Sequence, residues 1–342
     1  SSQNVDGLNY NVAVGYGAGT AVTTGTNNTL IGGLAGDALT SGAYNTALGY
    51  NALSTEDTGS RSVAIGWSAL EDQNYDGESN NVAIGYGVAK QLTTGLQNVF
   101  VGALAGDALT TGSSNIAIGY AAMSTANGAE SRNVAIGQFA LFAMDADGNN
   151  YNVAVGYDAG KAITTGTLNT IIGGLAGDAI TTGTDNVAVG YESLSKNVDG
   201  DKNVALGNYA LQDFEADTDG HGSNTAVGYT AMMECTTGTL NTAVGALSLG
   251  NGVLTGDANV ALGYKSGYAL SGGSANTAVG YETLMTENGH GLNVAIGYRA
   301  LRLQDAGADA FNVAVGFDAG TTITSGVQNT IMGGRAGDAL TT

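Results

Sequence analysis

Two acidic segments carry the residues whose types and spacing best suit metal chemistry. They read DADGN at 145–149 and ADTDG at 216–220, and each holds two carboxylates separated by one residue. Ca²⁺ prefers clustered carboxylate and carbonyl oxygens, and the first segment begins like a calcium-binding loop. The glutamate expected at its twelfth position is replaced by Gly156. Two interpretations stay open, a solvated acidic loop and a Ca²⁺ site, and the candidate ligands are Asp145, Asp147, Asp217 and Asp219.

Residues suited to catalysis are sparse. The two histidines, His221 and His290, lie in polar, glycine-flanked segments, and Cys235 is the one cysteine. Nucleophilic catalysis requires a nucleophile, a base and an orienting group held together by the fold, and no such group repeats here. No glycine-rich stretch has the spacing of a nucleotide-binding loop. We therefore expect a non-enzymatic protein without an organic cofactor.

Composition narrows the range of partners. The 342 residues include 56 glycines and no proline, and 30 acidic against 10 basic residues give a net charge of −20. Nucleic acids and anionic membranes are bound largely through Lys and Arg, so neither is expected as a partner. No apolar run approaches the ~20 residues of a membrane-spanning helix, so membrane insertion is not expected either.

The elements that position these residues are repeats. The motif N-x-[apolar]-x-G occurs nineteen times at spacings of 17 to 21 residues, with Ser62 in place of one asparagine. A larger unit of four motifs begins near residues 11, 81, 152, 224 and 312, and NTIIGGLAGDAITTG at 169–183 is the second motif of one such unit. Self-similarity of this kind indicates a repeat architecture. We predict a single repeat domain over residues 1–342, and we interpret it as a segment of a longer chain.

Each repeat is too short for a pair of helices and opens with a β-type run such as VAVGY at 12–16. The sequence thus predicts an all-β fold, a parallel β-solenoid of about 19 coils of 17–21 residues, stacked ~4.8 Å apart. Stacked asparagines would form a hydrogen-bonded ladder, and the motif glycine would occupy a left-handed or crowded position. Both faces of each strand lack charge, which indicates that one lines the core and the other packs on a neighbouring chain.

The repeats resemble a known family. NVAIG at 81, 133 and 293 and NTAVG at 224, 241 and 276 are similar to the repeats of trimeric autotransporter adhesin heads, of the Yersinia adhesin A type. Comparable arrays occur in tail-fibre proteins of phages. The resemblance covers residues 11–342 and implies a left-handed β-roll formed by three chains, a homotrimeric rod. The coils here are longer than those of the family, with TTG or acidic insertions after the strand.

The resemblance implies a fibre or adhesin segment that attaches to a host-cell surface receptor or glycan. Its location would be extracellular, on a virion tail fibre or a bacterial cell surface. Alternatives are a structural filament or spacer without its own receptor and, from the TTG and TSG segments, an ice-binding solenoid. The insertions in the fourth coil of each unit are the most acidic and variable segments. Because binding residues commonly lie on loops of a rigid scaffold, these insertions are the candidate binding segments, with Ca²⁺ as the expected ligand and a solvated acidic surface as the alternative.

Overall fold

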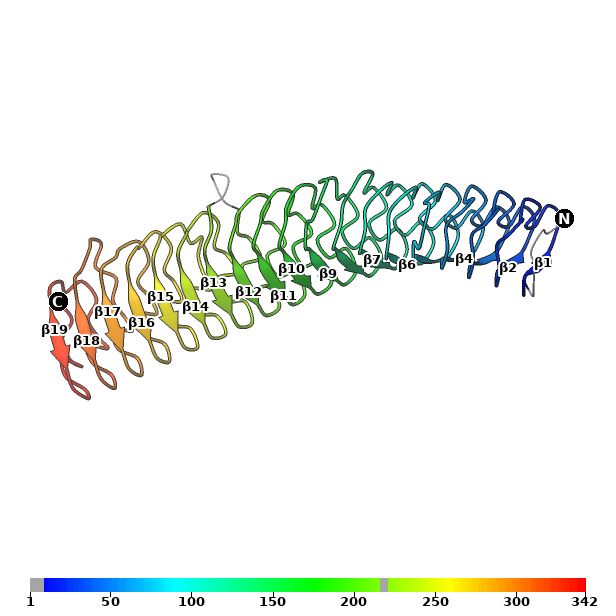
Figure 1. Ribbon diagram of the computed structural model, residues 1–342. Coiled ribbons are helices and arrows are strands. Elements are labelled where there is room, and N and C mark those ends of the chain that lie inside the picture. The colour runs from blue at the N-terminus through cyan, green and yellow to red at the C-terminus, as the bar shows by residue number, and fades with distance from the viewer. Residues whose placement is uncertain (1–8, 216–220) are drawn as a thin grey trace. The chain divides into compact units, whose positions relative to one another are not determined.

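The computed structural model describes residues 9–215 and 221–342 (Figure 1). The chain forms two compact units, residues 1–169 and 170–342. In the described residues every regular element is a β-strand, and no helix occurs. Each strand has three residues and begins directly after the motif asparagine or Ser62, which confirms the predicted β-solenoid of about nineteen coils.

The first unit contains nine strands and the second contains ten. In the first unit they are β1 Val12–Val14, β2 Thr29–Ile31, β3 Thr46–Leu48, β4 Val63–Ile65, β5 Val82–Ile84, β6 Val99–Val101, β7 Ile116–Ile118, β8 Val134–Ile136 and β9 Val153–Val155. In the second they are β10 Thr170–Ile172, β11 Val187–Val189, β12 Val204–Leu206, β13 Thr225–Val227, β14 Thr242–Val244, β15 Val260–Leu262, β16 Thr277–Val279, β17 Val294–Ile296, β18 Val313–Val315 and β19 Thr330–Met332.

Within each unit, consecutive strands pair in parallel and in register. Ala83 of β5 lies beside Phe100 of β6, and Ala278 of β16 lies beside Ala295 of β17. The central residue of the strand points into the coil and is buried from β2 to β19. The two flanking residues point outward. Each unit is therefore a stack whose core is narrow and built largely from alanine and leucine.

The asparagine ladder is confirmed. The side-chain oxygen of Asn28 accepts a hydrogen bond from the backbone N–H of Asn45 in the next coil, at 2.9 Å. Its Nδ2 donates to the carbonyl of Gly42 at the end of its own coil, at 2.9 Å. Asn186 makes the same two bonds to Asn203 and Gly200. Each buried amide thus joins its coil to the next one and also bonds the end of its own coil to the start. This double role explains why asparagine recurs at this position of the motif.

The motif glycine occupies both a left-handed and a crowded position, as predicted. Its φ lies between +122° and +146° in all nineteen coils, a region that strains any residue with a side chain. A Cβ on Gly85 would also lie 2.5 Å from the carbonyl oxygen of Gly102 in the next coil. Close stacking of backbone on backbone therefore excludes every other residue.

The recurring segment GGLAGDAL, as at 32–39, is explained by packing in the core. In four of the five units the second coil carries a large central strand residue, such as Phe100, and a glycine six residues later, such as Gly106; the second coil of the unit near 224 has Ala243 and Leu249 instead. A Cβ on Gly106 would lie 2.7 Å from the Phe100 ring. The next coil reverses the sizes, with Ala117 on the strand and buried Met123 six residues later. The recurring segment therefore reflects complementary packing in the core, in which a large side chain in one coil lies beside a small one in the next.

Candidate functional site

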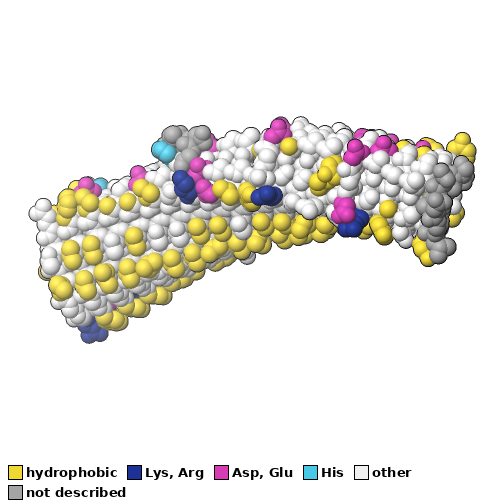
Figure 2. All heavy atoms as spheres, viewed as in Figure 1, with side chains coloured by type: hydrophobic (Ala, Val, Ile, Leu, Met, Phe, Trp, Pro, Cys, Tyr) yellow, Lys and Arg dark blue, Asp and Glu magenta, His cyan; other side chains and the backbone are white. Residues whose placement is uncertain are grey.

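The outward face of the strands is apolar and exposed. None of the nineteen strands contains a charged residue. Outward side chains such as Ile84, Ile136, Val244 and Ile296 remain 36–38% exposed. Hydrophobic side chains form rows across the coils of the second unit in Figure 2. Monomeric soluble proteins rarely expose contiguous apolar surface of this kind, so this face is a candidate interface.

Aromatic side chains extend this face two residues beyond the strands. Tyr264, Tyr281, Tyr298 and Phe317 lie in consecutive coils, and their rings stack with centroids 5.1–5.4 Å apart. The guanidinium of Arg299 lies 4.8 Å from the centre of the Tyr298 ring. Offset stacking and the cation contact stabilise a surface row that would otherwise be mobile.

The acidic loops lie in the lengthened coils and are held at both ends. Gln73 and Ser79 are buried, whereas Asn74, Asp76 and Glu78 between them are exposed. Parallel bridges return two of these loops to the preceding coil, and the paired residues are Ser60 with Glu78 and Ser131 with Asn149. Most of the acidic side chains visible in Figure 2 lie along its upper margin, and a few lie beside Lys or Arg side chains on the middle of the face. Each unit thus presents one apolar face and one acidic edge.

The predicted Ca²⁺ ligands are only partly described. Asp145 and Asp147 are exposed, and Asp147 accepts a hydrogen bond of 2.9 Å from the backbone N–H of Ala129. Asp217 and Asp219 lie outside the described residues. Asp147 therefore ties its loop to the preceding coil, and within the described part of the chain neither Asp145 nor Asp147 belongs to a cluster of three metal-ligating side chains. The Ca²⁺ site stays a prediction.

A buried column of side chains lies beneath these loops, eleven residues after the motif asparagine. It is mostly apolar, with members such as Leu39, Leu92, Met144 and Ile163. The coil before each long loop departs from this rule. Glu56, Asn197 and Glu287 occupy the column there, and in one coil Ala126 leaves room for the buried carboxylate of Glu130. We call these buried polar sites the polar corners.

The Glu56 corner is satisfied by the protein itself. One carboxylate oxygen accepts a hydrogen bond from the backbone N–H of Gly59 at 2.6 Å. The other accepts from the side chain of Gln73 at 3.0 Å and the backbone N–H of Tyr75 at 3.3 Å. Burial raises the pKa of Glu56, and these three hydrogen bonds oppose that rise.

The Glu287 corner is arranged differently. Its carboxylate is fully buried, and neither oxygen accepts a hydrogen bond of good geometry, although the backbone and imidazole of His290 lie close to it. The nearest polar atom is Nδ1 of His290, 3.4 Å from Oε1, and this nitrogen also lacks a hydrogen bond. Burial raises the pKa of Glu287, the charge of Asp305 raises it further, and the imidazole and backbone of His290 lower it. The corner holds ionisable groups without the hydrogen bonds that stabilise Glu56.

One position accounts for this difference. The residue fourteen places after the motif asparagine is Gly59 in the first corner and His290 in the second. A Cβ on Gly59 would lie 2.4 Å from the Glu56 carboxylate. The glycine therefore leaves the space that the Glu56 carboxylate fills. Because His290 has a Cβ, the Glu287 carboxylate cannot adopt the same position.

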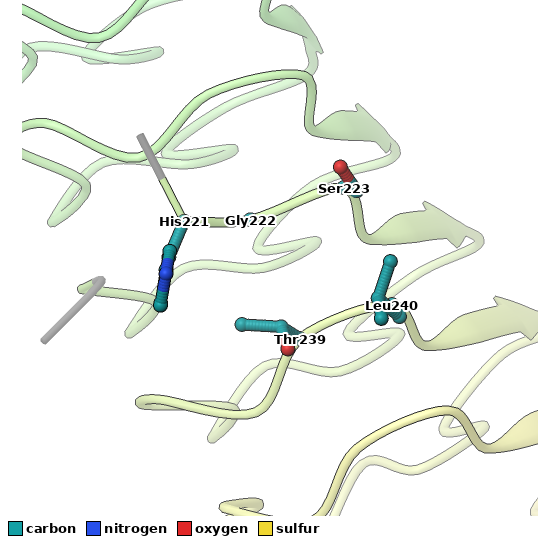
Figure 3. Close-up of a pocket in the computed structure, with 5 residues that line it drawn as sticks. All are labelled: His221, Gly222, Ser223, Thr239 and Leu240. Carbon is teal, nitrogen blue, oxygen red and sulfur yellow. The ribbon is translucent and has the colours of Figure 1, made fainter. Parts of the chain in front are cut away.

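The other residues suited to chemistry that the structure describes include His221, Ser223 and Cys235. A hollow of about 220 Å³ is lined by His221, Gly222, Ser223, Thr239 and Leu240 from two neighbouring coils. Figure 3 shows the His221 imidazole and the Ser223 hydroxyl pointing in different directions. The Thr239 hydroxyl is already bonded to Asp257. Cys235 is buried in the apolar column, and burial raises its pKa to about 12.

Sequence reasoning missed the Glu287 corner. The sequence placed His290 only in a polar, glycine-flanked segment and assigned no role to Glu287 or Asp305. The signal was positional, since Glu287 stands in an apolar column and His290 stands where most coils have glycine. Reading each repeat column for such departures would have brought the two together.

Comparisons with known proteins add no further assignment. No protein-family model matches the sequence, and no curated protein or solved structure matches it. Among the residues that the structure describes, no helix has the length and hydrophobicity needed to cross a membrane.

Proposed function

We propose that this chain is a segment of a homotrimeric extracellular fibre or adhesin that attaches to a host-cell surface receptor or glycan. It would belong to a virion tail fibre or a bacterial cell surface, as the resemblance of its repeats implies. The observation that carries the proposal is the uncharged, exposed strand face. That face needs a cover, and identical chains supply the same repeat at the same spacing.

The acidic edge supports the second part of the proposal. When strand faces pack together, the loops of the lengthened coils are left on the outside of the assembly. Their exposed carboxylates, including Asp76, Asp145 and Asp309, vary from loop to loop on a uniform scaffold. Variable loops on a rigid support are common sites of recognition. The proposed activity is binding, without catalysis.

The oligomer is tested by sedimentation equilibrium. We expect the mass of three chains for the unaltered protein, and monomers for the double variant Ile84→Glu and Ile136→Glu. Because both side chains are already exposed, charge there should leave the isolated chain folded while opposing burial between chains. Ala308→Glu, in an exposed loop, is the matched control and should remain trimeric. A monomeric unaltered protein would contradict the proposal.

Attachment is tested separately with fluorescently labelled trimer on candidate host cells. We expect saturable binding that is lost when the loops at 74–78 and 305–309 are replaced by short Gly–Ser turns. A folded trimer that binds no cells would favour the alternative, a spacer without its own receptor.

A further inference from the structure

Three metal-ligating side chains converge at the Glu287 corner. Glu287 and His290 come from the coil of β16, and Asp305 comes from the loop that follows β17. One ligand atom from each lies within 4.8 Å of the others. Within residues 9–215 and 221–342, this is the cluster of three His, Cys, Asp or Glu side chains that could hold a metal ion.

The cluster combines one buried ligand with two ligands that are partly or fully exposed. Glu287 is fully buried, the His290 side chain is 29% exposed, and Asp305 is exposed. Solvent therefore reaches the Asp305 carboxylate and part of the His290 imidazole, while His290 Nδ1 is buried beside Glu287, so an ion would enter past Asp305. Exposed acids alone would be ordinary surface residues, so the buried carboxylate distinguishes this site.

The buried groups lack well-formed hydrogen bonds in the protein. Both Glu287 oxygens and the Nδ1 of His290 are without hydrogen bonds. Buried polar groups in folded proteins are nearly always paired, and an unpaired one requires an explanation such as a bound ion. A buried carboxylate without a cation or hydrogen bond is strongly unfavourable. His290 Nδ1 lies 3.4 Å from one Glu287 oxygen, and the second buried oxygen has no such neighbour, so the carboxylate can accept a further positively charged partner.

The backbone on both sides of the cluster is fixed. The His290 carbonyl accepts a hydrogen bond from Nδ2 of Asn276 at 3.1 Å. The Asp305 backbone N–H donates to the carbonyl of Thr324 at 2.9 Å. Rotation of side chains alone can therefore bring the three ligand atoms together, since the main chain that carries them is held by the solenoid ladder.

The first unit contains the same corner without the ligands. Glu287 and Gln304 correspond to Glu56 and Gln73, and in each pair the two residues lie 17 positions apart. His290 corresponds to Gly59, and Asp305 corresponds to Asn74. The second corner thus differs by gaining one imidazole and one carboxylate, while losing the hydrogen bonds that satisfy the buried glutamate.

We propose that Glu287, His290 and Asp305 bind a divalent first-row transition-metal ion, for which Zn²⁺ is the probe. An imidazole with two carboxylates suits Zn²⁺ and related ions, whereas Ca²⁺ and Mg²⁺ prefer oxygen ligands throughout. A tetrahedral Zn²⁺ holds its nitrogen and oxygen ligands about 2.0–2.2 Å from the metal. The three ligand atoms, now within 4.8 Å of one another, need to move slightly closer together to reach that geometry. Three protein ligands leave a fourth position for water on the exposed side of the site.

Such an ion would link two successive coils at the start of the long loop. Its binding would supply the charge that buried Glu287 lacks and stabilise the folded state by mass action. Asp305 also lies in the loop at 305–309 that is proposed for attachment, so replacing that loop alters both properties. Zn²⁺ binding itself depends only on the fold of one unit, and His290→Gly tests it with the attachment loops intact.

The test is calorimetric titration of Zn²⁺ into the chelator-treated full-length protein, with 1 mM Mg²⁺ and 150 mM NaCl present to saturate weak acidic sites. We expect one Zn²⁺ per chain, a rise in melting temperature, and an X-ray absorption spectrum with nitrogen and oxygen ligands only. His290→Gly and Asp305→Asn, which install the residues of the first corner, should each weaken binding by at least about 100-fold.

Two further variants complete the test. Glu56→Gln alters the first corner and should leave Zn²⁺ affinity unchanged, and His221→Asn removes the other histidine with the same expected result. Absence of Zn²⁺ binding by the unaltered protein would overturn the proposal. So would stoichiometric binding that survives in folded His290→Gly, or a preference for Ca²⁺ over Zn²⁺.

Discussion

The Glu56 and Glu287 corners occupy the same place in the repeat and solve one problem in opposite ways. Each places a glutamate in a column that is mostly apolar, directly before a lengthened coil whose own residue in that column is the buried Gln73 or Gln304. Glu56 is held by three hydrogen bonds, whereas Glu287 has none of good geometry and faces His290 Nδ1 at 3.4 Å. The comparison shows that substituting the residue at one position of the repeat can change the local chemistry, because the surrounding coils keep the backbone in the same conformation.

The glutamine partner shows how local the difference is. The side-chain oxygen of Gln73 accepts a hydrogen bond from Asn81, and that of Gln304 accepts one from Asn312 in the same way. The nitrogen differs, because in Gln73 it donates to Glu56 and in Gln304 it donates to the carbonyl of Gly326. The side-chain oxygen of the glutamine therefore accepts from the ladder asparagine in both corners, whereas the side-chain nitrogen donates to the glutamate only in the first corner.

The largest effect is expected from adding a methyl group to the first corner. Gly59→Ala places a Cβ 2.4 Å from the Glu56 carboxylate, which must move and abandon its hydrogen bonds. We expect a loss of about 2–4 kcal/mol of stability and faster hydrogen exchange in residues 56–60, measured by thermal unfolding and exchange mass spectrometry. Gly289→Ala, in the matched coil, is the control, since a Cβ there meets nothing within 4 Å. Equal tolerance of both changes would refute the explanation.

A smaller effect, opposite in sign between the corners, is expected from Glu→Gln. Glu56→Gln replaces an acceptor oxygen by a donor facing other donors, so we expect a loss of about 1–3 kcal/mol. Glu287→Gln removes a buried ionisable group that has no hydrogen bond, so the chelator-treated protein should gain roughly 1 kcal/mol at neutral pH. Chemical unfolding of both variants at pH 7.5 measures the two values. The same sign for both would break the comparison.

The smallest effect concerns pH. Burial and Asp305 raise the folded-state pKa of Glu287 above the unfolded value of about 4.3. The folded state then binds the proton more tightly, so stability is highest below the unfolded pKa and falls as pH rises through the folded pKa. We expect the stabilising effect of Glu287→Gln in chelator-treated protein to vanish at about pH 4 and to grow toward neutrality. A difference between variant and unaltered protein that is constant with pH would disagree with this assignment.

The sequence by itself determined the architecture. Nineteen strands begin where the motif predicts, since a 17-residue period with a β-type run can bury its core only by stacking. The roles of the ladder asparagine and of Gly85 and its equivalents also followed from the sequence, because a position repeated nineteen times reveals its backbone requirement. An apolar outer strand face followed from the absence of charge at alternating positions.

Only the tertiary structure decided which polar residues meet. Glu287 and Asp305 are 18 positions apart in the sequence, yet stacking of the coils brings their ligand atoms within 4.8 Å of each other. Sequence reasoning chose Asp145 and Asp147 because they are neighbours along the chain, and the structure instead shows Asp147 bonded to the preceding coil. In a solenoid the closest side chains lie one coil away, about 4.8 Å along the stack. Loop lengths set which of them face each other, and that depends on the folded path of each lengthened coil.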